Sequence, residues 1–159
     1  MCPVKIPCRN VTTNKHPHPR RLARIAVFQG LYALAISGEE PEKVIRDLWE
    51  RYSFEKPGRD YVHQLLQAVW DHRFWLEQVI RDHLQNWDYE RVALLDRLIL
   101  QMAIAEIFFI EDVPPKVSIA EAIEIAKEYS TEESSGFVNG ILDAIYKETQ
   151  RKGFRPPSD

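Results

Sequence analysis

The most apolar stretch of the chain, residues 91–110, predicts a helix that is buried on most of its circumference. Five polar residues interrupt it: Arg91, Asp96, Arg97, Gln101 and Glu106. At about 100° per residue, Asp96, Arg97 and Gln101 share one narrow side, which we expect to face water, whereas Glu106 lies apart among apolar positions. A membrane span is the competing interpretation, but the longest run without a polar residue is far shorter than the roughly 20 residues that a bilayer requires. Other helices of the chain must therefore cover this one.

Apolar residues recur at helical spacing along most of the remaining sequence. This periodicity predicts helices at residues 20–36, 41–51, 60–85, 119–129 and 133–150, and the third of these is expected to bend near Asp71 and His72. No segment has the alternation typical of a strand. The predicted fold class is therefore all-α, a single compact bundle of about six or seven helices around the buried central helix.

Local signals predict where several of these helices begin and end. The central helix is expected to begin after an N-cap at Asp88 and to stop at the prolines 114 and 115, because proline lacks a backbone donor. The sequences Ser118-Ile-Ala-Glu121 and Ser130-Thr-Glu-Glu133 have the pattern of capping boxes that open the last two helices. Gly38 is a C-cap signal after the first helix, and Pro57-Gly58 is expected to break the chain before the third.

Charge is distributed unevenly along the 159 residues, of which 45% are hydrophobic. The first 38 residues contain six basic residues and no acidic one, so this segment carries a charge of +6, whereas the whole chain carries a net charge of −3. Residues 1–19 contain four prolines and little periodicity, which predicts a disordered basic N-terminal arm. We expect one all-helical domain at residues 20–150 and a flexible C-terminal tail at residues 151–159.

The two cysteines, Cys2 and Cys8, lie in the arm, and neither a secretory signal nor a disulfide framework is visible. The cytoplasm is therefore the expected compartment. Together with His16 and His18 they could hold zinc, but their spacing matches no usual zinc pattern, and a disordered tail without metal is the preferred interpretation. No cofactor is predicted.

Sequence motifs of enzymes are absent, since the chain contains no nucleophile elbow, phosphate loop, dinucleotide fingerprint or zinc-protease motif. We therefore predict a binding protein and not an enzyme.

Arg20, Arg21 and Arg24 follow the basic arm, an arrangement suited to phosphates, although a solvated helix end would look the same. Gly136 and Gly140 lie within a predicted helix, which indicates close approach either by a packed neighbour, the preferred alternative, or by a ligand.

Three segments closely resemble the NusB family of bacterial transcription antitermination factors. They are RRLARIAVFQGLY (residues 20–32), LLDRLILQMAIAEI (94–107) and DVPPKVSIAEAIEIAKEYSTEESSGFVNGILDAI (112–145). The resemblance covers nearly all of residues 20–147 and implies an all-helical, non-enzymatic protein that binds boxA-type single-stranded nascent RNA. It also implies a partnership with the small-subunit ribosomal protein NusE, within an RNA polymerase antitermination complex with other Nus factors that acts on ribosomal RNA operons.

The same resemblance implies roles for individual residues. RNA-binding roles fall on Arg20, Arg21, Arg24, Gln29 and Phe137, and partner-binding roles on Tyr32 and Glu106. For Phe137, a place in the core is the alternative to stacking on a base. For Glu106, the alternatives are solvent and an internal partner.

The sequence departs from the family pattern at several positions: Leu22, Gln101, Ala120 and Gly136. Of these, Gln101 and Gly136 stand where the family pattern has a positive charge.

Two other functions fit the same helical pattern. One is the helical RNA-binding domain of a ribosomal RNA cytosine methyltransferase, which would require a further catalytic domain. The other is a self-associating helical interaction protein, because some relatives form homodimers.

Overall fold

A computed structural model describes residues 18–153 and residue 156, and within them it contains seven α-helices, one 3-10 helix and no strand. The all-α prediction is therefore confirmed. Cys2, Cys8, His16 and most of the predicted arm lie outside the described residues, as does most of the tail beyond Gly153. None of the described helices is long and apolar enough to cross a membrane.

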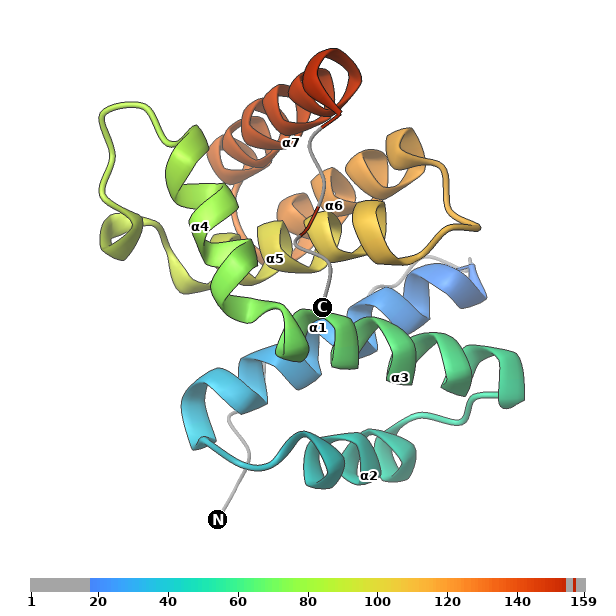
Figure 1. Cartoon of the computed structure of the whole chain (residues 1–159). Coiled ribbons are helices and arrows are strands. Elements are labelled where there is room, and N and C mark those ends of the chain that lie inside the picture. The colour runs from blue at the N-terminus through green and yellow to red at the C-terminus, as the bar shows by residue number, and fades with distance from the viewer. Residues whose placement is uncertain (1–17, 154–155, 157–159) are drawn as a thin grey trace. The chain divides into compact units, whose positions relative to one another are not determined.

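The helices group into two units, the first of which extends to His63. It contains α1 (Pro19–Ser37), α2 (Pro41–Arg51) and the beginning of α3 (Lys56–Asp71), and α1 packs against α2 (Figure 1). Gly38 ends α1 with a φ of 67°, in the left-handed region that glycine adopts without a Cβ clash, and its N–H donates to the carbonyl of Leu34. This confirms the predicted C-cap.

The second unit begins at Gln64 and is built around the apolar helix. It contains the rest of α3, α4 (Arg73–His83), the 3-10 helix η1 (Tyr89–Arg91), α5 (Leu94–Phe109), α6 (Pro115–Tyr129) and α7 (Glu132–Lys152). Helix α5 contacts α4, α6 and α7 (Figure 1). Most of its residues are buried. Its central position in this unit agrees with the prediction.

Several predicted helix ends are wrong, and prolines explain most of them. Helix α6 begins at Pro115, so Ser118 lies inside the helix and does not cap it. Pro57 and Gly58 likewise belong to the first turn of α3. Proline suits the first turn because its missing N–H would have no intrahelical acceptor there. A proline that indicates a break between helices thus also indicates where the next helix begins.

Two further caps differ from the sequence prediction. Asp88 precedes η1 without a side-chain cap, while α5 begins only at Leu94 after Ala93. At α7 the N-cap is Thr131, whose Oγ1 accepts a hydrogen bond of 3.0 Å from the N–H of Ser134. The predicted bend is confirmed, because α3 ends at Asp71 and α4 starts two residues later.

The expectation that Asp96 faces water is also wrong. Its residue is only 6% exposed, and both of its carboxylate oxygens accept hydrogen bonds, from Ser130 Oγ at 3.1 Å and from Ser134 Oγ at 3.0 Å. These serines lie at the end of α6 and in the first turn of α7, where a negative charge is also favoured by the α7 dipole. Asp96 therefore holds the α6–α7 turn against α5.

Substitution of Asp96 by asparagine keeps the shape but removes the charge. Hydrogen bonds to a charged group contribute more than neutral ones, so we expect the free energy of unfolding to fall by about 1 to 3 kcal/mol. Urea denaturation followed by circular dichroism measures this change. Asp143→Asn is the control, because Asp143 pairs with Lys147 on the surface and its replacement should cost under about 0.5 kcal/mol. Equal destabilisation of both variants would contradict the assigned role of Asp96.

Candidate nucleic-acid interface

The N-terminus of α1 gathers the three arginines that the sequence singled out. His18 precedes the helix, and its Nδ1 accepts a hydrogen bond of 3.2 Å from the N–H of Arg20. No acidic residue lies in the first turn, so three positive charges stand close to the positive end of the helix dipole. A bound anion would offset this unfavourable arrangement, as backbone N–H groups at a helix start also favour anions.

Tyr61 on α3 supports two of these arginines. The Arg20 guanidinium lies over the Tyr61 ring, 4.1 Å from its centroid, and that of Arg24 lies at 5.9 Å. Arg24 is only 4% exposed, whereas Arg20 and Arg21 are half-exposed. The structure thus separates the three: Arg20 and Arg21 are partly exposed, whereas Arg24 is buried near the same Tyr61 ring as Arg20. The sequence did not predict Tyr61, because nothing local marks a ring that meets an arginine about 40 residues away.

Gln29 lies on the same helix and is held by neighbours from the end of α2 and just beyond it. The hydroxyl of Tyr52 donates a hydrogen bond of 2.6 Å to Gln29 Oε1, and Arg51 Nη1 is 3.5 Å from the same oxygen. These contacts fix the orientation of the amide. Tyr32, the predicted partner contact of α1, is half-exposed.

Helix α7 carries Phe137, the remaining predicted RNA contact, and the two glycines that the sequence singled out. Phe137 is half-exposed, beside the fully buried Val138, so it lies at the border between core and surface. Gly136 and Gly140 are exposed, and a Cβ added to either would meet no described atom within 4 Å. The preferred explanation of these glycines, tight packing against another helix, is therefore wrong within the described part of the chain.

Glu106 on α5 is buried, with 2% of its surface exposed. The hydroxyl of Ser118 on α6 donates a hydrogen bond of 2.6 Å to Glu106 Oε1. Of the three alternatives for this carboxylate, exposure to solvent is thus excluded and an internal partner is present. Contact with another protein stays a prediction. Ser118, which the sequence indicated as a helix cap, is instead a support for Glu106.

The sequence matches the model of the NusB family over residues 21–147. The transcription antitermination protein NusB of Chloroherpeton thalassium is 42% identical over 135 residues, which cover 84% of this chain and 64% of that relative. The NusB of Syntrophus aciditrophicus is 38% identical over 133 residues, covering 84% of this chain and 83% of the relative.

Solved structures show the same similarity. A structure of NusB from T. maritima has a TM-score of 0.75 and 36% identity, and the match covers 82% of this chain and 92% of that one. A structure of the antitermination factors NusB and NusE in complex with dsRNA has a TM-score of 0.74 and 27% identity, covering 83% and 98%.

Gly140→Ala tests whether α7 carries a glycine that folding does not need. Alanine is favoured over glycine in a helix, and its Cβ would meet open space, so the free energy of unfolding should rise by about 1 kcal/mol. Thermal and urea denaturation measure the change. Gly38→Ala is the contrasting variant, since its positive φ strains alanine and should lower stability. A destabilised Gly140→Ala protein would show that the helix surface at this position is not open.

Proposed function

The chain belongs to the NusB family, whose matched relatives are named transcription antitermination proteins and not enzymes, and we propose that it binds boxA-type nascent RNA together with NusE during transcription of ribosomal RNA operons. The observation that carries the RNA-binding part is the pair Arg20 and Arg21, both accessible at a helix start that has no acidic residue in its first turn. The related NusB that was solved with NusE and dsRNA supports the general ability to bind RNA and NusE, and the single-stranded boxA-type RNA is part of the proposal.

In this proposal Arg20 and Arg21 hold RNA phosphates. Arginine presents a planar fork of donors that matches the phosphate geometry. The Tyr61 ring limits the rotamers of Arg20, so less side-chain entropy is lost when the phosphate binds. Arg24 is buried and acts as a positioning residue for the same ring, while Gln29 offers an oriented amide farther along α1.

Phe137 provides the proposed stacking surface for a base. An aromatic ring at the border of the core is fixed by its buried edge and offers the remainder to a ligand. The glycines on either side of it leave the backbone of α7 uncovered, which lets a nucleotide approach closely. The proposed RNA contacts thus come from two separate helices, α1 and α7.

NusE is the proposed protein partner, with Tyr32 and Glu106 as its contacts. In this proposal a basic residue of NusE shares the carboxylate of Glu106 with the hydroxyl of Ser118. We further propose a cytoplasmic protein that acts with RNA polymerase and other Nus factors. Light scattering with and without RNA would separate this function from homodimerisation.

A three-way titration tests the proposed function. A labelled single-stranded boxA-like RNA is titrated with this protein, with NusE, and with both, and fluorescence anisotropy reports binding. If the two proteins share one RNA, the affinity of the mixture should exceed that of either protein by more than tenfold, because the second binding event becomes intramolecular. A duplex RNA of the same sequence serves as a competitor. Purely additive binding would contradict the proposal.

Glu106→Gln is the matched variant for this titration, since it nearly preserves shape and removes the charge. Removal of a buried charge that faces NusE should lower the affinity for NusE by about 2 to 5 kcal/mol and abolish the cooperative binding, with RNA binding of the free protein unchanged. A lower melting temperature with unchanged affinity for NusE would instead assign Glu106 to internal hydrogen bonding, including the bond from Ser118.

Two further variants distinguish residues that hold phosphates from those that hold bases. In the double variant Arg20→Ala, Arg21→Ala, the slope of log affinity against log salt should decrease by about 0.7 for each single-strand phosphate that is no longer neutralised. Phe137→Leu should weaken binding by about 1 to 3 kcal/mol and leave that slope unchanged, because stacking releases no counterion. An unchanged slope in the arginine variant would show that these arginines do not hold phosphates.

A further inference from the structure

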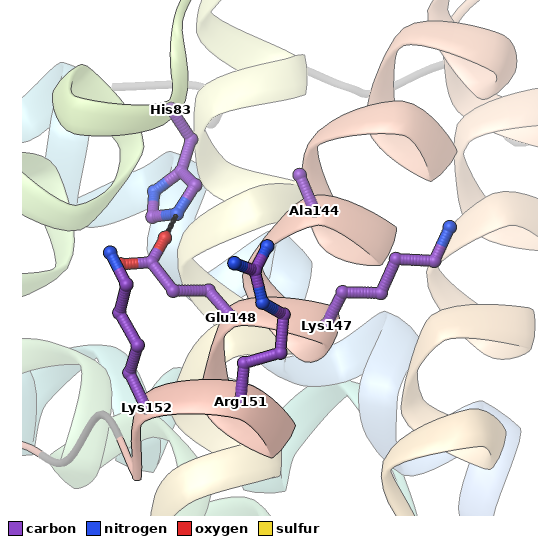
Figure 2. A pocket seen from close by; sticks show the side chains of 6 residues that line it. All are labelled: His83, Ala144, Lys147, Glu148, Arg151 and Lys152. Atoms are coloured by element: carbon purple, nitrogen blue, oxygen red, sulfur yellow. Dashed lines mark hydrogen bonds and ion pairs between the residues drawn. The ribbon is translucent and has the colours of Figure 1, made fainter.

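A hollow of about 290 Å³ lies beside the C-terminal half of α7, and none of the proposed RNA or NusE contacts lines it (Figure 2). It is lined by His83 at the end of α4 and by five residues of α7: Ala144, Lys147, Glu148, Arg151 and Lys152. Three of the six side chains carry a permanent positive charge. Figure 2 shows the His83 ring and the Glu148 carboxylate facing one another.

His83 and Glu148 form a pair with no net charge. His83 Nδ1 lies 2.7 Å from the carbonyl of Val79, which can only accept, so Nδ1 carries a proton. His83 Nε2 lies 2.5 Å from Glu148 Oε2, and this hydrogen bond requires one further proton between the two atoms. Whether that proton resides on the ring or on the carboxyl, the charges of the pair sum to zero. Glu148 therefore does not repel an anion in the hollow.

The remaining charges leave the hollow positive. Lys147 Nζ lies 2.8 Å from Asp143 on the exposed side of α7, and their charges offset one another. Arg151 and Lys152 contribute an excess of two positive charges. Basic residues in the last turn of a helix also complement its dipole, but the dipole amounts to only about half a unit charge. The surplus is what an anion would neutralise.

The exposed face of α7 connects this hollow with Phe137. At about 100° per residue, Gly136, Gly140, Ala144 and the cations Lys147 and Arg151 fall within roughly 80° of one another, opposite the buried face of the helix. Small residues thus line the path between the aromatic ring and the cations. Phe137 and Arg151 are about 21 Å apart along the helix axis, a length that a few nucleotides can span.

We propose that this hollow binds a phosphate group of the RNA strand whose base stacks on Phe137. Arg151 supplies the donor fork, Lys152 supplies a point charge, and the His83–Glu148 pair forms a neutral wall. The proposal rests on the proposed RNA-binding function for the source of the phosphate. The affinity of the hollow for a phosphate group is independent of that function, because a free phosphate has the same chemistry.

The test uses the full chain with both Arg151 and Lys152 replaced by alanine, because these two cations carry the excess charge of the hollow. Affinity for single-stranded RNA should fall roughly tenfold, and the log-log salt slope should decrease by about 0.7, the value for one phosphate. The matched control replaces Lys43 and Arg46 on α2, which are also an exposed lysine and arginine. Its effect should stay under twofold. Equal effects of the two double variants would overturn the proposal.

A second measurement distinguishes RNA from free phosphate as the source of the anion. The imidazole signals of His83 are followed by NMR during titration with single-stranded RNA and, separately, with inorganic phosphate. RNA should shift them at a concentration where inorganic phosphate does not. A shift with inorganic phosphate alone would overturn the assignment to RNA, and no shift with either would overturn the site. If the wild-type protein binds no RNA, the proposed function fails, and the titration with inorganic phosphate alone decides whether the hollow binds a phosphate group.

Discussion

Two buried carboxylates on α5 fix the arrangement of the second unit. A carboxylate removed from water is costly unless it accepts hydrogen bonds, so each must meet a donor. Asp96 accepts from Ser130 and Ser134, and Glu106 accepts from Ser118. These hydrogen bonds lie at opposite ends of α6, so any sliding or rotation of α6 along α5 would break at least one of them. Apolar packing brings these helices together, whereas the carboxylates select one register.

This register also determines which face of α7 is buried and which is exposed. Because Ser134 is held by Asp96 in the first turn of α7, the rotation of the helix is set at its start. Val138, Leu142 and Ile145 then face the core. The opposite face presents two glycines and an alanine, with the cations near the end. The glycines weaken the helix, and a Cβ added to either would meet no described atom within 4 Å, so packing among the described residues does not account for them. Proposed ligand contacts thus occupy positions that the core leaves free.

In the first unit, contacts within the fold likewise determine the placement of the α1 arginines. Three cations at a helix start are unfavourable together, and the fold places each of them in a different environment. Arg24 is withdrawn from solvent, Arg20 lies against the face of Tyr61, and Arg21 stays half-exposed. An aromatic face stabilises a guanidinium without removing its donors from a ligand. Tyr61 therefore keeps Arg20 in place and leaves it available for a phosphate.

The helical class, the approximate helix spans, the C-cap at Gly38, the bend after Asp71 and the family could all be predicted from the chain alone, because each depends on local spacing or on a contiguous motif. The burial of Asp96, the support of Glu106 by Ser118 and the place of Tyr61 under Arg20 could not, since each joins residues 12 to 41 positions apart. Helical periodicity assigns a polar residue to the wet face by default. The packing of distant helices supplies the donors that allow a carboxylate to turn inward, and it leaves Gly136 and Gly140 facing open space.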